Sequence, residues 1–256
     1  MLEKLTPEEH SYLIGFLQGD GSHSKQTRNR GKIVIEIAKQ DIDILDKIEG
    51  LLSKTVYVGR GGRQRNTNFK NNYESASLTV CNWSFRQEIA KDVPIGYKSM
   101  IIQPPNWVIP KHYIRGLVDA EGSIGFVKTG EPFCAIFILS ESVKDFILAS
   151  IQNVLEVRKT LNRNKRDNAY NIMLNNEDAI NYARWLYKDA SIYMDRKWNK
   201  ANEIQTWVRT RARRPRGLKW SSDEDKIVLS SISMKRKLSK LNRTAAAISI
   251  RKWRLK

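Results

Sequence analysis

An internal duplication is the feature that most limits how this 256-residue chain can fold. The stretch YLIGFLQGDGS at 12–22 returns as YIRGLVDAEGS at 113–123, an offset of 101 residues. Each copy is followed by a β-like run, KIVIEIAKQ or AIFILSES, and then by apolar residues spaced three and four apart, as in a helix. A repeat of about 100 residues is typical of two similar units packed as a pseudo-dimer, and not of a solenoid.

Each copy of the repeat is predicted to be a helix with defined ends. Thr6 and Glu9 have the spacing of a capping box in front of the first copy, and Pro110 suits the first turn of the second. Gly21 and Gly122 stand where a left-handed C-terminal cap is expected.

Small residues recur four apart along both predicted helices. Gly15 and Gly19 form one such pair, and Gly116 and Ala120 form the other. Glycine inside a helix costs up to about 1 kcal/mol relative to alanine, so these positions need a packing reason. The simplest reason is that the two helices pack closely against each other.

Close packing of these helices would bring two carboxylates together, Asp20 and Glu121. The C-terminal end of a helix carries partial negative charge and like charges repel, so two acids at this place are unfavourable. Divalent cations with a preference for oxygen ligands, such as Mg²⁺, would offset both effects. Two acids at a shared metal centre can activate water and stabilise a leaving oxygen on a phosphodiester.

The segments LIGFLQGDG at 13–21 and IRGLVDAEG at 114–122 resemble the two LAGLIDADG motifs of single-chain homing endonucleases. The resemblance covers residues 6–208. It implies an α+β fold of two pseudo-symmetric αββαββα units, 1–104 and 105–208, with saddle-shaped antiparallel sheets. It also implies cleavage of both DNA strands, with metal ions bound by Asp20, Glu121 and the backbone carbonyls of Gly19 and Ala120.

The same resemblance implies further catalytic residues. A basic residue late in each unit is expected near each centre, and the segments PIGYKS and YMDRKWNKA nominate Lys98 and Lys197. Gln40 follows the strand-like run IVIEIA, where the family has a water-orienting polar residue. The motif itself departs from the family at Gln18, which replaces the first acid, and at Arg115, which replaces a small residue.

Two predicted hairpins carry polar and basic loops. Strands are expected at 55–58 and 75–80 in the first unit, and at 157–162 and 169–174 in the second. Arg reads guanine and Asn or Gln reads adenine through paired hydrogen bonds, so these hairpins are expected to read bases in a major groove. The DNA-binding residues predicted there are Arg60, Arg63, Arg65, Asn68, Lys70, Arg163, Lys165 and Arg166.

Charge is concentrated at the C-terminal end of the chain. Residues 209–256 hold 16 Lys and Arg against 3 Asp and Glu, which is +13 of the net +18. Residues 209–219 read as a basic linker that can follow phosphates, or as a merely solubilising linker. The predicted DNA contacts within it are Arg211, Arg213, Arg214 and Arg216.

Residues 220–256 are expected to form three short helices, with Ala247, Ile248 and Trp253 in their core. The pattern is similar to a small Myb-like helix-turn-helix module, which puts its last helix in a major groove. A basic three-helix tail without sequence preference is the alternative. The predicted DNA contacts are Arg243, Arg251, Lys252 and Arg254.

The sequence therefore favours a monomeric, magnesium-dependent homing endonuclease of mobile-intron type, with two or three ions near the paired acids. Its partner would be double-stranded DNA with a long asymmetric target. An intron-splicing maturase that binds intron RNA and a non-cleaving DNA-binding regulator are the alternatives. Two cysteines, and no apolar run of about 18 residues, favour a reducing compartment without membrane. That compartment would be a bacterial or phage-host cytosol or an organelle matrix, and the protein would not be secreted.

Overall fold

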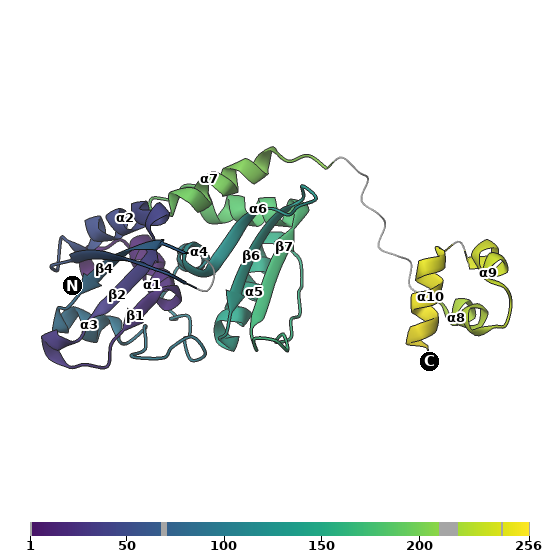
Figure 1. Cartoon of the computed structure of the whole chain (residues 1–256), viewed down its shortest axis with the longest axis horizontal. Helices are drawn as coiled ribbons and strands as arrows, with labels where there is room; N and C mark the ends of the chain where they lie inside the picture. The colour runs from purple at the N-terminus through teal and green to yellow at the C-terminus, as the bar shows by residue number, and fades with distance from the viewer. Residues whose placement is uncertain (1, 68–70, 210–219, 242, 256) are drawn as a thin grey trace. The chain divides into compact units, whose positions relative to one another are not determined.

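A computed structural model describes residues 2–67, 71–209, 220–241 and 243–255 (Figure 1). The chain divides into two compact units, Met1–Val208 and Arg209–Lys256, each of which is described by itself. No helix among the described residues is long and apolar enough to span a membrane. The predicted Asn68, Lys70 and linker arginines Arg211, Arg213, Arg214 and Arg216 lie outside the described residues.

The first half of Met1–Val208 has the order αββαββα, as predicted. Its sheet is antiparallel with strand order β1-β2-β4-β3. The short 3₁₀ turns are η1 (Leu2–Lys4), η2 (Arg28–Arg30) and η3 (Lys39–Asp41). The main elements are α1 (Pro7–Gly19), β1 (Gly21–His23), β2 (Ile33–Ala38), α2 (Ile42–Leu52), β3 (Gly59–Arg65), β4 (Tyr73–Val80) and α3 (Trp83–Ile89).

The second half repeats this order with one strand fewer among the described residues. Its antiparallel sheet has the order β5-β6-β7. The elements are α4 (Pro110–Glu121), β5 (Gly122–Phe126), β6 (Pro132–Ile138), α5 (Glu141–Leu155), β7 (Tyr170–Asn175), α6 (Asn176–Tyr187), α7 (Asp195–Glu203) and η4 (Ile204–Thr206). The α+β class with antiparallel sheets is thus confirmed.

Two strand predictions were wrong, and both segments follow a helix. Residues 55–58 do not form a strand, because the backbone N–H groups of Thr55 and Val56 both donate to the Leu52 carbonyl and complete the end of α2. Residues 157–162 are not a strand either. There the Lys159 side chain donates to the Met173 carbonyl of β7, at 2.9 Å, so a side chain and not a backbone ladder joins this segment to the sheet.

The duplication seen in the sequence persists in the strand pairing. Gly21 pairs with Ile35 in the first sheet, and Gly122 pairs with Ile136 in the second, so the offset of 101 holds on both strands. In an antiparallel ladder, directly paired residues point to the same face of the sheet. Equivalent residues of the two units therefore point to equivalent faces.

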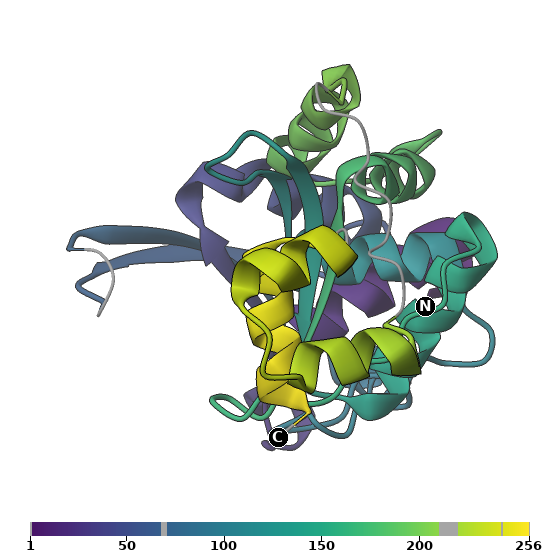
Figure 2. The same ribbon diagram turned by 90° about the vertical axis from the view of Figure 1, so that its right-hand side faces the viewer.

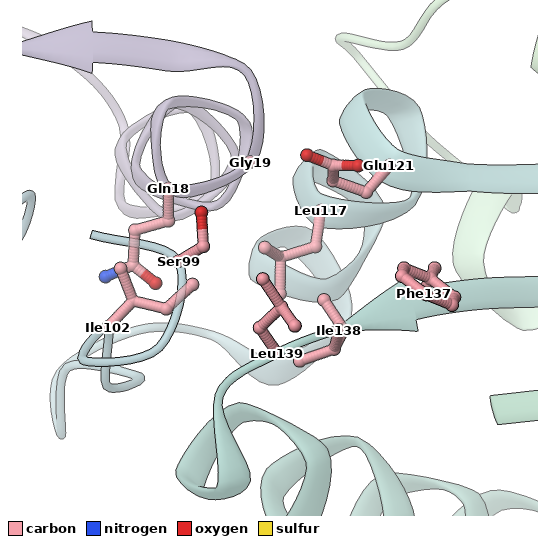
Figure 3. Close-up of a pocket in the computed structure, with 9 residues that line it drawn as sticks. All are labelled: Gln18, Gly19, Ser99, Ile102, Leu117, Glu121, Phe137, Ile138 and Leu139. Carbon is pink, nitrogen blue, oxygen red and sulfur yellow. The ribbon is translucent and has the colours of Figure 1, made fainter. Parts of the chain in front are cut away.

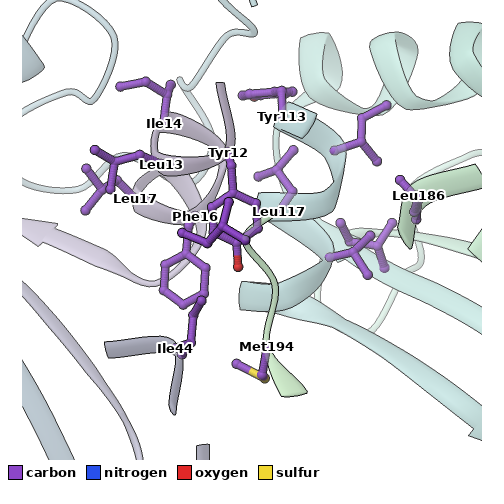
Figure 4. Close-up of a cluster of buried hydrophobic side chains, with 14 of the residues drawn as sticks. Tyr12, Leu13, Ile14, Phe16, Leu17, Ile44, Tyr113, Leu117, Leu186 and Met194 are labelled. Atoms are coloured by element: carbon purple, nitrogen blue, oxygen red, sulfur yellow. The ribbon is translucent and has the colours of Figure 1, made fainter. Parts of the chain in front are cut away.

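The two copies of the motif form α1 and α4, called the motif helices below, which cross at their glycines. A Cβ on Gly15 would lie 2.1 Å from the Tyr113 carbonyl oxygen, and one on Gly116 would lie 2.2 Å from that of Tyr12. Apolar side chains of both helices fill the space around the crossing (Figure 4). The predicted close packing of the stripe of small residues is confirmed.

The ends of the motif helices agree only partly with prediction. The Thr6–Glu9 capping box is present, with bonds of 2.8 and 3.2 Å. The left-handed caps were wrong: Gly21 lies in β1, and Gly122 is extended at φ −88°. Glycine is needed at position 21 because a side chain does not fit there: a Cβ on Gly21 would lie 2.5 Å from the Leu17 carbonyl oxygen. The strand thus leaves each helix at once.

The C-terminal unit contains three short helices, as predicted. They are α8 (Ser222–Leu229), α9 (Met234–Leu241) and α10 (Ala245–Arg254). Val228, Leu241 and Ile248 form the core, and Trp220 packs against it. The prediction of Trp253 as a core residue was wrong, because its side chain is 78% exposed. Trp220 fills the aromatic position instead.

The helix crossing predicts a contrast between two glycine-to-alanine substitutions. Gly15→Ala should lower the free energy of unfolding by about 3 kcal/mol or more, because backbone atoms of α4 occupy the space that the new methyl group needs. Gly50→Ala on α2 should stabilise the fold by about 0.5–1 kcal/mol, because nothing lies within 4 Å of its added Cβ. Chemical denaturation of both variants measures this. Equal effects would contradict the proposed role of the crossing.

Candidate active site

Asp20 and Glu121 lie side by side at the C-terminal ends of the motif helices. Asp20 is the C-cap of α1 and Glu121 is the last residue of α4. The ends are so close that a Cβ on Gly19 would lie 2.4 Å from the Ala120 Cβ and 3.3 Å from the Glu121 Cγ. Burial, and next the negative charge of Glu121, raise the pKa of Asp20 to about 7. The structure therefore brings the two predicted acids together.

Lys98 and Lys197 each lie at the end of one motif helix. The Lys98 ammonium donates to the carbonyls of Gln18 and Gly19 on α1, at 2.5 and 2.6 Å. The Lys197 ammonium donates to the carbonyls of Val118 and Asp119 on α4, at 2.8 and 2.5 Å.

These two lysines occupy equivalent places in the two units. Both are buried, and burial lowers the pKa of Lys98 to about 8 and also lowers the pKa of Lys197. Glu121 and Asp20 act in the opposite direction on Lys98, and Asp119 and Asp20 do so on Lys197. Each centre thus combines one carboxylate with one buried ammonium group, in the positions expected from the sequence.

The donor atoms at this place suit a hard cation such as Mg²⁺. Carboxylate and carbonyl oxygens are the atoms that Mg²⁺ prefers, and it usually keeps several waters. Among the described residues, no cluster of three or more His, Cys, Asp or Glu could hold a metal. Asp20, Glu121 and the carbonyls of Gly19 and Ala120 would therefore share their ions with water or substrate oxygens. Lys98 already donates to the Gly19 carbonyl, which has a second lone pair available.

Gln40 is brought to a different place from the two acids. It is exposed on η3 and lines an open groove with Gln64, Tyr73 and Glu74. Its neighbour Asp41 is buried, and the charge of Asp41 contributes to the raised pKa of Asp20. A catalytic role for Gln40 stays a prediction.

A small pocket of about 80 Å³ adjoins the Glu121 carboxylate between the two halves (Figure 3). Gln18, Gly19 and Ser99 line one side, and Leu117, Phe137 and Ile138 line the other. The Ser99 hydroxyl points toward the gap between the helix ends (Figure 3). The residue after Lys197 is Trp198, which stacks on Tyr193 with ring centroids 5.3 Å apart, so the two centres have different surroundings.

No family model and no curated protein matches this sequence. Solved structures do match. The homing endonuclease I-WcaI bound to its DNA recognition sequence is similar over 77% of this chain and 87% of its own, with 15% identity and a TM-score of 0.55. The I-SmaMI LAGLIDADG homing endonuclease bound to cleaved DNA is similar over 79% and 89%, with 12% identity and a TM-score of 0.50. Full-length WhiA from Thermatoga maritima is similar over 99% and 93%, with 14% identity and a TM-score of 0.49.

The fold is the LAGLIDADG fold. The likeness to I-WcaI and I-SmaMI covers about the length of the duplicated part of this chain, residues 6–208, and both neighbours were solved with DNA.

The motif helices hold a buried polar network that sequence reasoning missed. The Tyr12 hydroxyl of α1 donates to Asp119 of α4 at 2.6 Å, and the Tyr113 hydroxyl of α4 donates to Gln18 of α1 at 2.5 Å. Asp119 also accepts a bond of 2.5 Å from the Tyr187 hydroxyl. The network is part of the packed interior, because all of these side chains are buried. The repeat of Tyr12 at Tyr113 was the signal that could have revealed it.

Ion pairs between the two halves of Met1–Val208 were also missed. Arg196 forms two bonds with the buried Asp41, at 2.7 and 2.8 Å, and Lys47 pairs with Asp195 at 2.5 Å. Since Asp195, Arg196 and Lys197 are consecutive on α7, these pairs connect the first half to the helix that carries Lys197. No local sequence pattern marks contacts separated by about 150 residues, because they form only once the halves have packed.

The first sheet has one face covered by helices and one uncovered face, called the first outer face. Arg63 pairs with Ser75 and Arg65 with Tyr73 on this face, whereas Arg60 pairs with Leu78 of the core. The strand therefore directs the three predicted arginines to opposite sides. The members of the first outer face are Ser22, Val34, Glu36, Ala38, Gly59, Gly61, Arg63, Arg65, Tyr73, Ser75, Ser77 and Thr79.

Acidic residues hold these arginines. Arg60 bonds to Asp46 and Glu49 of α2, at 2.5 and 2.7 Å. Arg63 makes two bonds of 2.8 Å to Glu36. The blue hairpin of β3 and β4 projects from the rest of the unit in Figure 2. A DNA contact by Arg60 stays a prediction, on the side opposite to Arg63.

The basic residues of the second hairpin lie in the loop before β7. Arg163 donates to the Asn168 carbonyl at 2.7 Å and lies over the Tyr170 ring, while Arg166 pairs with Asp167 at 2.8 Å. Lys165 is exposed. Their DNA contacts stay predictions.

The predicted arginines of the C-terminal unit are partly used inside that unit. Arg243 forms two bonds of 3.0 Å with Glu224, and Arg251 forms two bonds of 2.7 Å with Asp225. Both guanidinium groups lie over the ring of Trp220, which explains the burial of that ring. Lys252 and Arg254 are exposed on α10, so they are the better candidates for phosphate contacts.

The raised pKa of Asp20 predicts that this carboxylate destabilises the metal-free protein. Folded Asp20 retains its proton up to about pH 7, whereas the unfolded chain loses it above 3.8, so stability falls as pH rises between these values. Asp20→Asn should therefore raise the free energy of unfolding by on the order of 2–4 kcal/mol at pH 8. The gain should shrink toward pH 5.

Chemical denaturation in EDTA at pH 5 and pH 8 measures this difference. Asp46→Asn, which removes an exposed acid from α2, is the matched control. A variant that is no more stable than wild type at pH 8 would show that Asp20 is not strained by burial and by Glu121.

Proposed function

We propose that this chain is a site-specific DNA endonuclease that makes a metal-dependent, staggered double-strand break in a long asymmetric target. The observation that carries the proposal is the pair of carboxylates, Asp20 and Glu121, at the adjoining ends of two crossed helices. Neighbours with the same fold that are homing endonucleases bound to DNA support it.

The two acids suit phosphodiester hydrolysis better than a structural role. A structural pair would be neutralised by partners, yet the larger effects on Asp20 are burial and Glu121, both of which oppose its ionisation. Bound Mg²⁺ would supply charge that stabilises the attacking and leaving oxygens of a phosphodiester. The acids and the carbonyls of Gly19 and Ala120 would hold these ions, two or three in number.

Lys98 and Lys197 would act on the scissile phosphate of the DNA and not on a nucleobase. Their ammonium groups lie at the negative ends of the motif helices, where they offset the partial charge of the carbonyls. An ammonium group in this place can stabilise the developing charge on a phosphate oxygen. Each DNA strand would thus be bound by one carboxylate and one lysine.

The chain would work as a monomer, because both halves of the catalytic centre belong to one polypeptide. The C-terminal unit would extend the contact along DNA as a helix-turn-helix module, with α10 in a major groove. The capping box of Ser221 and Glu224 and the small core around Val228 support a folded module of this kind. A mobile intron is the genetic setting that this activity suits.

Cleavage should require both acids. Asp20→Asn and Glu121→Gln should each lower the rate of double-strand cleavage at least about a thousandfold, since each removes one anionic metal ligand. Their DNA affinity should stay within a fewfold of wild type. Magnesium-dependent cleavage and mobility-shift binding of a randomised or host-locus duplex library measure both quantities.

Asp145→Asn is the matched control for cleavage, because it removes an exposed acid from α5, away from the proposed site. If wild type binds DNA but does not cut it in the presence of any divalent metal tested, the result would favour the regulator. Tighter binding of intron RNA than of any duplex would favour the maturase.

Deletion of residues 209–256 should shorten the footprint on DNA and flatten the dependence of affinity on salt. The deleted part carries +13 of the net charge, and each phosphate that the protein no longer neutralises makes the negative slope of log K against log salt shallower by about 0.9. Footprinting, together with binding measured from low to physiological salt, checks both effects. An unchanged footprint would show that this part does not lie on DNA.

A further inference from the structure

The uncovered face of the second sheet differs in chemistry from the first outer face. By ladder pairing, this second outer face includes Phe133, Ala135, Phe137, Asn171, Met173 and Asn175. Both asparagines are exposed, Phe137 is 39% exposed, and the other three residues are half-buried. The described strands β5, β6 and β7 contain no Lys or Arg.

The two faces differ at one pair of equivalent positions. Glu36 follows the residue paired with Gly21, and Phe137 follows the residue paired with Gly122, so they are equivalent at the offset of 101. Glu36 binds Arg63, whereas Phe137 lines the pocket beside Glu121 (Figure 3). Equivalent positions thus carry an ion-paired acid on the first sheet and an aromatic ring on the second.

We propose that the two sheets read half-sites of different base composition. The second outer face takes an A·T-rich half-site, and the first takes a half-site whose specific contacts are to G·C pairs. This inference rests on the DNA binding proposed above. DNA is the occupant because residues 1–208, which contain both sheets, keep +5 of the net charge of +18, and because both faces begin at the strands that leave the two carboxylates.

The second outer face has the groups that recognise A·T pairs. In a major groove, thymine presents a methyl group that suits apolar side chains, and adenine presents a donor and an acceptor that suit Asn. Phe133, Phe137 and Met173 supply apolar surface between Asn171 and Asn175, which pair with Phe137 and Phe133 in the ladder. A G·C pair would leave its acceptors unsatisfied against these rings.

The first outer face has the groups that recognise guanine. Arg63 is held by two bonds to Glu36, which itself accepts a bond of 2.7 Å from Ser75, so the guanidinium has a fixed direction. A guanidinium has five N–H donors, so two bonds to Glu36 do not exhaust Arg63. Arg65, also paired with Glu36, lies over the Tyr73 ring. Paired donors of this kind suit the two acceptors of guanine.

The test begins with selection of duplexes from a randomised library by the full chain in EDTA. One half of the enriched duplex should be A·T-rich and the other should contain guanine. Deoxyuridine, which lacks the thymine methyl group, is then substituted for thymine in each half separately. It should weaken binding about fourfold for each buried methyl in the A·T-rich half, and no more than about twofold in the other. Substitution of 7-deazaguanine should weaken binding about tenfold in the guanine half.

Variants connect each half to its sheet. Arg63→Ala should abolish the effect of 7-deazaguanine at one guanine, and Asn171→Ala should abolish discrimination at one adenine of the A·T-rich half. Asn153→Ala, at an exposed position of α5, is the matched control and should change neither. Equal deoxyuridine effects in the two halves, loss of the guanine signal in Asn171→Ala, or no enriched sequence would overturn the proposal.

The same selected duplex separates this inference from the proposed activity. If this duplex stays uncut in Mg²⁺ while deoxyuridine still weakens binding in one half only, the proposed nuclease activity is contradicted and the proposed base recognition is supported. If the duplex is cut but deoxyuridine weakens binding equally in both halves, the nuclease activity is supported and the proposed base recognition is overturned.

Discussion

The contact between Gly15 and Gly116 is the constraint on which the rest of the duplicated unit depends. Backbone atoms of one motif helix occupy the space that a side chain on the other would fill. Only helices that cross this closely bring Gly19 against Ala120, and hence Asp20 to Glu121. Because each helix is followed at once by a strand, the same crossing also sets where both sheets begin. Packing and chemistry therefore have one origin.

This arrangement concentrates negative charge, and the lysines show how the fold tolerates it. The carbonyl ends of both helices and two carboxylates converge on one place, and burial of Asp20 disfavours its charge. Lys98 and Lys197 donate to the carbonyls rather than bonding to the acids, so the partial charge of each helix end is offset while both carboxylates stay available. A cation would complete the neutralisation. The negative charge that the lysines leave at this site would favour binding of a cation.

The sequence was sufficient for the parts of the site that repeat. Duplication marked both helices and both acids, the resemblance to a known family nominated both lysines, and short-range rules predicted the cap at Thr6. It was insufficient where long-range contacts decide. Thr55 has a β-branched side chain typical of strands, yet it completes a helix end, and the pair of Arg196 with Asp41 joins residues 155 apart. Whether an arginine points to the helices or to the outer face depended on strand register, which composition does not reveal.

A duplicated frame leaves each half free to differ wherever the crossing is not involved. Gln18 and Asp119 occupy equivalent positions and both accept a tyrosine hydroxyl from the opposite helix, so a neutral amide and an acid serve the same contact. Glu36 and Phe137 are equivalent in register but have opposite chemistry, and neither position supports the helix crossing. Symmetry is thus kept where backbones touch, and it is broken on the surfaces that a target sequence would contact. An asymmetric target is what such a pseudo-dimer is suited to read.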